Sequence, residues 1–242
     1  MKKILFAILM VCIMAAPAAA KVTFVLPSTQ DDFKNLSRDL GLAISYMPLA
    51  PAEPLGFPGF DIGVEATGVS IDKNASYLKN SVTNPNDLPS YIPEAKAHAQ
   101  VGLPVVPIDL GIVYGTAPST DVKLVGYEIK WAFLRGSTVA PAVAIRGAYT
   151  KLSGINVLDI ETKSLDLSIS KGFAMFTPYA GIGEVWITSK PKGSIPLGIE
   201  KADLTETKGF VGAKLSLGLI NFVAEADFAK VNAYSLRMNL HF

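Results

Sequence analysis

The chain has 242 residues and a formal net charge of +1, and half of its residues are hydrophobic, with a mean hydropathy of +0.34. Such a chain has no basic excess with which to neutralise phosphates, which excludes nucleic acid as a partner. The one cysteine, Cys12, lies in the leader segment, so the processed protein has no disulfide, thiol catalyst or cysteine metal site.

Residues 1–20 have the pattern of a cleaved signal peptide. A basic start precedes an apolar run at 4–14, which is too short for a membrane-spanning helix of about 20 residues. The predicted cleavage-site residues are Ala18, Ala20 and Lys21. A lipoprotein signal ending at Cys12 is the alternative, and the valine before that cysteine disfavours it. Cleavage removes two lysines, so the formal net charge of +1 becomes −1.

Residues 21–38 are predicted as an amino-terminal segment that precedes the folded barrel. Ser28 and the acidic residues after it suit a helix N-terminus, so a short helix is predicted at about 30–37, in the periplasm or in the barrel mouth. The first strand is predicted at about 39–48, because apolar and small residues alternate from Leu40 onward with period two.

After a proline-rich connection, further segments alternate apolar and polar side chains at the period of a strand. These strands are predicted at about 59–72, 97–115, 121–134, 138–152, 156–170, 176–190, 206–218, 221–229 and 234–242. An exported, oily chain made of such segments, without a spanning helix, fits an all-β, closed antiparallel up-and-down transmembrane β-barrel over residues 39–242. The predicted strand count is about ten, with eight and twelve as alternatives.

Connection lengths assign the two ends of the predicted barrel. The joins at 135–138, 171–175 and 218–221 are short and are predicted as periplasmic turns, whereas the long join at 190–206 is predicted to lie outside. A polar, turn-rich insertion occupies 73–96, and the strand count places it in the periplasm, against this trend. A miscount by one strand pair is the alternative.

Charged residues on the face opposite the apolar side chains are predicted to point into the lumen. This set is Asp61, Glu65, Asp109, Glu128, Lys130, Arg146, Asp166, Lys214, Glu225, Asp227 and Arg237. Hairpin geometry pairs Lys214 with Glu225, Asp227 with Arg237, and Arg146 diagonally with Glu128. Because about ten strands leave a lumen little wider than side chains can fill, the set is interpreted as a filler network. A selectivity lining of a pore is the alternative.

Aromatic residues near the strand ends are predicted to form two girdles at the membrane interfaces. The outer set is Tyr46, Tyr114, Tyr149 and Trp186, and the inner set is Trp131, Phe133, Phe222 and Phe242. The alternative is the aromatic core of a soluble periplasmic β-sandwich.

No residue pattern in the chain predicts catalysis. His98 and His241 are the two histidines, and their spacing does not make a recognisable metal site. No motif marks a serine nucleophile beside either of them. We therefore predict no catalytic, metal-binding or cofactor-binding residue and no cofactor. A barrel hydrolase that uses one of the histidines is the less favoured alternative.

The last nine residues, 234–242, place one apolar face against one polar face and end on an aromatic, Phe242. This ending resembles the C-terminal strand of bacterial outer-membrane β-barrels, which the barrel-assembly machinery reads. The alternating pattern of the whole processed chain is similar to the small barrel class that includes OmpA-like and OmpW-like proteins. The resemblance implies localisation in the bacterial outer membrane, with membrane lipid and the assembly machinery as partners.

That barrel class includes anchors, envelope-integrity proteins and narrow channels, so membership does not fix a role. We predict a non-enzymatic outer-membrane barrel with an envelope-structural or surface-loop role. A narrow passive channel for small or apolar solutes is the alternative.

Overall fold

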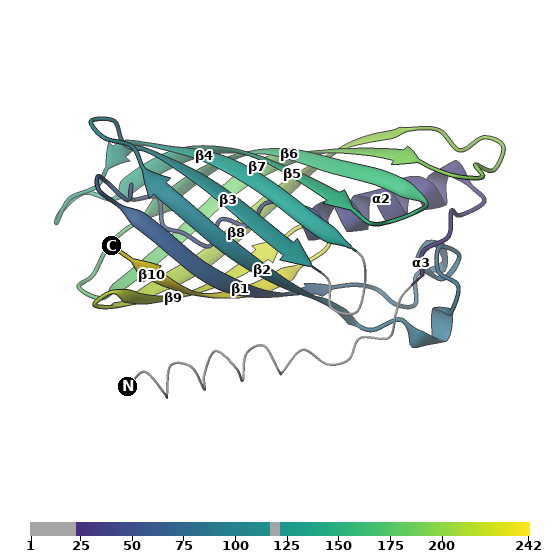
Figure 1. Cartoon of the computed structure of the whole chain (residues 1–242), viewed down its shortest axis with the longest axis horizontal. Coiled ribbons are helices and arrows are strands. Elements are labelled where there is room, and N and C mark those ends of the chain that lie inside the picture. Colours follow the sequence, from purple (N-terminus) through teal and green to yellow (C-terminus); the bar gives the residue numbers. More distant parts are fainter. Residues whose placement is uncertain (1–22, 117–121) are drawn as a thin grey trace.

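The computed structural model describes residues 23–116 and 122–242, so the predicted cleavage-site residues Ala18, Ala20 and Lys21 lie outside the described part. Ten strands form a closed barrel in which each strand pairs antiparallel with its sequence neighbours and β10 pairs with β1 (Figure 1). The strands are β1 (Phe60–Ser70), β2 (Tyr91–Gly102), β3 (Ile108–Thr116), β4 (Lys123–Arg135), β5 (Ala142–Ser153), β6 (Leu158–Ser170), β7 (Phe176–Pro191), β8 (Ala202–Leu217), β9 (Ile220–Phe228) and β10 (Ala233–His241).

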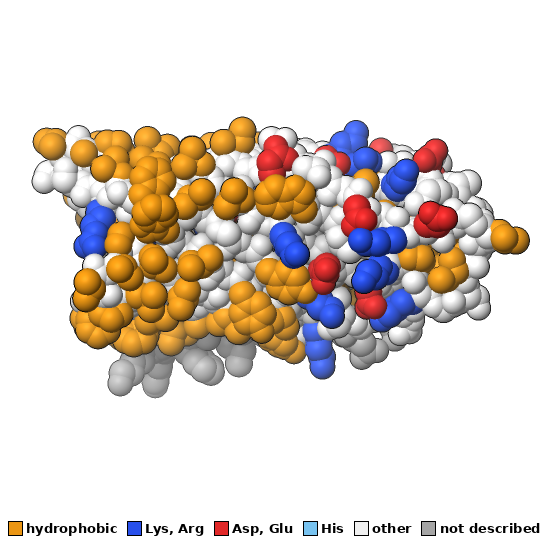
Figure 2. Space-filling model, turned by 90° about the horizontal axis from the view of Figure 1, so that it is seen from above, with side chains coloured by type: hydrophobic (Ala, Val, Ile, Leu, Met, Phe, Trp, Pro, Cys, Tyr) orange, Lys and Arg blue, Asp and Glu red, His pale blue; other side chains and the backbone are white. Residues whose placement is uncertain are grey.

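Apolar side chains cover the outside of one half of the barrel. Ile129, Leu167 and Val211 point outward and are each about half exposed. Hydrophobic side chains gather over the half that carries the short turns, and charged side chains gather over the other half (Figure 2). A closed sheet leaves no unpaired edge, and an apolar outer band fits lipid rather than water. The chain is therefore a transmembrane β-barrel of the bacterial outer membrane.

The helices are α2 (Gln30–Ile44), α3 (Ser76–Lys79) and the short 3₁₀ helix η1 (Pro85–Asp87). None of the helices in the described ranges has the length and hydropathy that a membrane crossing requires. α2 begins after Thr29, whose side chain accepts a hydrogen bond from the backbone N–H of Asp32, as an N-cap does. It packs against the inner faces of β5, β6, β7 and β8 and against α3.

Two strand predictions were wrong, and their errors cancel in the count. The strand predicted at 39–48 is instead the end of α2 and the start of the segment after it. The C-terminal half of α2 is buried on every side, so alternate positions are apolar although the residues are helical. The strand predicted at 97–115 is two strands, β2 and β3, because Pro104 and Pro107 lie in a turn rather than at kinks.

The two strand errors also misplaced the insertion predicted at 73–96. The structure has β2 beginning at Tyr91, and the β1–β2 connection at 71–90 lies at the same end as the long 192–201 connection. The prediction that the insertion lies at the end of the short turns was therefore wrong. The short connections at 103–107, 136–141, 171–175 and 218–219 lie at the opposite end, where β1 begins and β10 ends.

The amino-terminal part of the described chain passes through the barrel. Residues 23–25 contact 81–83 at the long-loop end, where Phe24 and Val82 form a bridge and the Val25 N–H donates to the Ser81 carbonyl at 2.9 Å. α2 then enters the lumen, and residues 45–59 continue to the short-turn end, where β1 begins (Figure 1).

The lumen therefore has two different fillings. The half of the lumen at the long-loop end is called the outer half below, and the half at the short-turn end is called the inner half. In the outer half, Phe33, Leu36 and Ile44 of α2 pack with inward apolar residues of the wall such as Ile160 and Ile187. In the inner half, the extended residues 45–55 lie among the buried charges of the wall.

Candidate functional site: the occupied lumen

The structure places ten of the eleven residues of the predicted inward set inside the barrel, each at most 7% exposed. The eleventh, Lys214, is partly buried and lines a cavity at the inner mouth. The wall also carries two buried lysines that were not predicted, Lys96 and Lys208. Lys208 is an even number of residues from Lys214 in the same predicted strand, so it points to the same face and could have been predicted. Lys96 lies within the insertion that was interpreted as a loop.

The predicted pairs had mixed outcomes. The structure brings the Arg146 Nε to 3.3 Å from the Glu128 carboxylate. Lys214 lies opposite Val223 rather than Glu225, and Arg237 also lies opposite Val223 rather than Asp227. Both pairings were wrong because the two turns centre earlier in the chain than assumed, which shifts the register by whole residue pairs.

The inward charges hold the backbone of the segment at 45–55. The Lys208 Nζ donates to the Tyr46 carbonyl at 2.7 Å and lies 3.3 Å from the Asp227 carboxylate. The Leu49 N–H donates to Glu225 at 2.9 Å, and the Leu49 carbonyl accepts a bond from Arg237 at 3.0 Å. Each of these side chains thus satisfies a backbone group that no strand partner reaches.

The lower part of the segment is held in the same way. The Lys130 Nζ donates to the Pro51 carbonyl at 3.1 Å and to the Glu53 carbonyl at 2.9 Å, and it forms an ion pair with Asp109 at 3.0 Å. The Leu55 N–H donates to Asp109 at 3.1 Å. The charge network therefore binds the backbone of a peptide segment, a role that the filler interpretation did not include.

Two side chains of the segment fit into the wall. Leu49 is fully buried and packs with Tyr179, Phe210 and Val223. Ala52 is fully buried in a box made by Ala132, Ala142 and Ala144. Leu49 has a φ of 44°, in the left-handed region that is unfavourable for a residue with a Cβ. Burial and the hydrogen bonds of its backbone hold it there.

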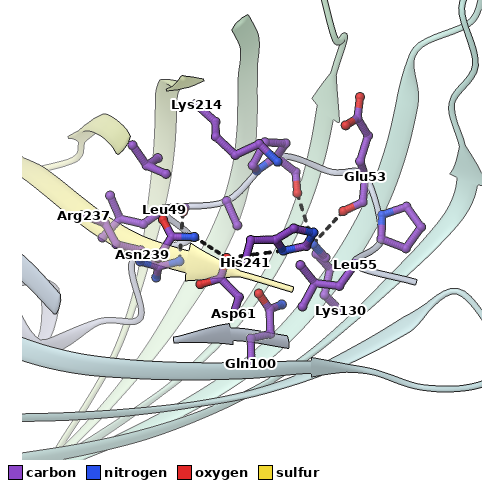
Figure 3. A pocket seen from close by; sticks show the side chains of 14 residues that line it. Leu49, Glu53, Leu55, Asp61, Gln100, Lys130, Lys214, Arg237, Asn239 and His241 are labelled. Carbon is purple, nitrogen blue, oxygen red and sulfur yellow. Dashed lines mark hydrogen bonds and ion pairs between the residues drawn. The ribbon is translucent and has the colours of Figure 1, made fainter. Parts of the chain in front are cut away.

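At the inner mouth, a cavity of about 190 Å³ lies beside the segment (Figure 3). Lys214, His241 and Gln100 are among its lining residues, and none of its lining residues is a serine. Both histidines approach one carboxylate, with the Nδ1 atoms of His98 and His241 lying 3.5 and 3.9 Å from Asp61. Asn239 also donates a hydrogen bond to Asp61.

None of the residues that line this cavity is a serine, threonine or cysteine. Among residues 23–116 and 122–242, no group of histidine, cysteine, aspartate and glutamate side chains is arranged to hold a metal ion. The residues that line the cavity at the inner mouth offer charged and hydrogen-bonding groups.

At the outer end, one contact joins the lumen to the long loops. The Tyr77 hydroxyl, in the 71–90 connection, donates to the Asp39 carboxylate of α2 at 2.6 Å. Burial raises the pKa of Asp39, and the hydrogen bond from Tyr77 opposes this shift. Burial is the main cause that raises the pKa of Tyr77, and the contact with Asp39 raises it further.

The aromatic residues predicted for the girdles lie on the outer surface, with one exception. Tyr46 was wrongly placed there, because it belongs to the segment in the lumen and is buried. Tyr149 and Trp186 lie in one row across neighbouring strands, together with Tyr127 and Lys163. The remaining exposed or partly exposed members are Tyr114, Trp131, Phe133, Phe222 and Phe242.

Comparisons with known proteins give distant structural neighbours. No protein-family model matches the chain, and no curated protein sequence matches it. The chain is similar to Ail, the attachment invasion locus protein of Yersinia pestis, with 10% identity over 76% of this chain and 97% of Ail, at a TM-score of 0.36. It is also similar to the translocator domain of the autotransporter NalP from Neisseria meningitidis, with 10% identity over 88% of this chain and 95% of that domain, at a TM-score of 0.41.

Proposed function

We propose that this protein is a self-plugged, non-enzymatic outer-membrane barrel with a surface role at its outer end. The observation that carries the proposal is the segment at 45–55, whose backbone is bound by buried side chains from several strands of the wall. Such a segment fills the polar part of the lumen. The segment therefore argues against a continuous water path through the lumen. It also argues against the alternative function, a passive channel that is open at rest.

The outer end supports the surface role. Residues 23–25, the 71–90 connection and α2 form one contacting group there, through the bridge of Phe24 with Val82 and the bond of Tyr77 with Asp39. The exposed loop at 192–201 extends beside them, with Leu197 at its tip. We propose that this group is presented outside the cell, and that the assembly machinery reads β10 with its terminal Phe242.

Conductance in planar bilayers tests the plug. We expect the wild-type protein to give no defined conductance steps. The variant L36D/L49D/A52D adds carboxylates to fully buried positions of α2 and of the segment, one of them beside Glu225, so it should expel both from the lumen and produce steps. The matched control, V139D/I195D/L197D, adds the same charges to exposed positions of the connecting loops and should stay closed. Regular steps from the wild type would refute the proposal.

A further inference from the structure

The segment in the lumen has a three-residue repeat. Pro48, Pro51 and Pro54 recur at every third position, and each residue after a proline donates its backbone N–H to the wall. The three bonds run from Leu49 to Glu225 at 2.9 Å, from Ala52 to the Ser170 hydroxyl at 3.1 Å, and from Leu55 to Asp109 at 3.1 Å. The wall therefore presents acceptors with the same repeat as the sequence.

Proline suits a peptide that lies inside a barrel without joining its sheet. It has no N–H, so each of the three prolines removes a buried donor that would otherwise need a partner. A three-residue repeat is also that of the polyproline II conformation, whose backbone groups point outward and are free to bind other groups. Leu49, with its positive φ, departs from that conformation and turns the segment at this point.

The contacts recognise a backbone, with two side-chain pockets that add selectivity. Lys208, Arg237 and Lys130 donate to carbonyl groups, which every peptide has. The apolar pocket takes a large residue, here Leu49, and the alanine box takes a small one, here Ala52. Hydrogen bonds to the backbone combined with pockets for particular side chains are a recurring way in which proteins bind extended peptides.

The barrel wall is complete without the segment. Every strand from β1 to β10 pairs on both sides, and residues 45–55 belong to no strand. The turn that joins the segment to β1 is accessible, with Phe57 67% exposed. The segment is thus related to the wall as a ligand is to its site, through side-chain contacts and one covalent connection at each end.

We propose that the lumen is a binding site for extended proline-rich polypeptides, and that residues 45–55 are its resident intramolecular ligand. The polypeptide class has proline at every third position, a large apolar residue after one proline and a small residue after the next. This inference rests on the proposed function, because a lumen open at rest would hold no resident ligand. It goes further in assigning the site to a peptide supplied by another molecule.

The test supplies the peptide to the full-length variant L36D/L49D/A52D. A fluorescent synthetic peptide of residues 45–55 is titrated into the detergent-solubilised variant, and its anisotropy is followed. We expect saturable binding to the variant and much weaker binding to the wild type, in which the resident segment competes for the site. In planar bilayers the same peptide should remove the conductance steps of the variant.

The matched control peptide has the same composition, with each of the three prolines exchanged with the residue after it. Proline then occupies positions 49, 52 and 55, and the three donors to the wall are lost. We expect this peptide to bind about tenfold more weakly or worse, as the loss of anchoring contacts predicts. Equal binding of the two peptides would overturn the inference.

The outcomes separate the two proposals. If the variant stays closed although its heat-modifiable gel migration shows a folded barrel, the proposed plug fails. If the variant conducts but the peptide neither binds nor closes it, only the present inference fails.

A second route covers the case in which the variant does not fold. A protease site inserted between Gly56 and Phe57 of the wild type allows cleavage after folding, and urea then releases the amino-terminal fragment. Rebinding of the peptide of residues 45–55 to the emptied barrel is expected. An emptied, folded barrel that does not bind it would overturn the inference.

Discussion

Lys130 connects the barrel wall to the segment inside it through three contacts. It reaches two carbonyl groups of the segment and the carboxylate of Asp109, and its side chain is almost fully buried. A buried charge of this kind is tolerated because its partners replace water, and removing one partner leaves the other unpaired. The residue therefore acts on both the stability of the wall and the position of the segment.

The substitution Lys130→Met tests this at the level of one residue. We expect a loss of about 3–5 kcal/mol in the free energy of unfolding in detergent, because Asp109 remains buried without its cation. Adding Asp109→Asn should restore part of the loss. The control Lys151→Met, at an exposed position of β5, should change stability by about 0.5 kcal/mol or less. Equal effects of the two lysine variants would contradict this account.

The direction of the interior residues could be predicted from the sequence, because alternation along a strand depends on the strand alone. Their partners could not. A pair such as Arg237 with Glu65 joins the last strand to the first one, and a local hairpin argument does not consider that seam. Arg237 also binds the carbonyl of Leu49, which no strand pattern could bring into the lumen.

At the level of elements, the C-terminal half of α2 is one of the two stretches that sequence periodicity assigned wrongly. Leu40, Leu42 and Ile44 alternate as in a strand, yet they are the buried end of a helix that is surrounded by the wall. The earlier part of α2 carried the usual signals of a helix start, and a short helix was predicted there. The extension to Ile44 depends on the barrel around it, which is tertiary information.

The contact of α2 with the 71–90 connection predicts a pH dependence. Because the pKa of Asp39 is raised in the folded state above its ordinary value of 3.8, folding favours its protonated form. Its contribution to stability is thus full below pH 3.8 and is lost as the pH rises through the higher folded-state pKa. Asp39→Asn mimics the protonated form and can still accept the Tyr77 hydrogen bond.

We therefore expect Asp39→Asn to be more stable than the wild type at pH 7, with the difference vanishing toward pH 3. Urea unfolding of both proteins across this range measures it. A difference that stays constant with pH would show that Asp39 is not responsible. Asp203→Asn, at an exposed position where hydrogen bonds from Lys201 and Thr188 lower the pKa, should not reproduce the effect.

For the whole molecule, the passage of residues 23–59 through the lumen adds one crossing to the ten of the strands. The described chain begins at the long-loop end and finishes at the short-turn end (Figure 1). Residues 23 and 242 are therefore expected on opposite faces of the membrane, although an even number of strands alone would place them on the same face.

Epitope tags in intact cells check this arrangement. A tag placed directly before residue 23 and a tag in the 192–201 loop should both bind antibody at the cell surface. A tag in the 171–175 turn should bind only after the outer membrane is permeabilised. Surface labelling of the 171–175 tag, or protection of the tag before residue 23, would reverse or break the assigned topology.

The passage of residues 23–59 through the lumen also constrains the order in which the barrel is filled and closed during biogenesis. A helix is about 10 Å wide with its side chains, and α2 fills the outer half of a closed ring. If the seam between β1 and β10 formed first, residues 23–44, including Asp31 and Asp32, would have to slide past the buried charges of the wall. We expect the earliest-made part of the folded chain to be enclosed by the wall, and the pairing of β10 with β1 to be the step that locks it in.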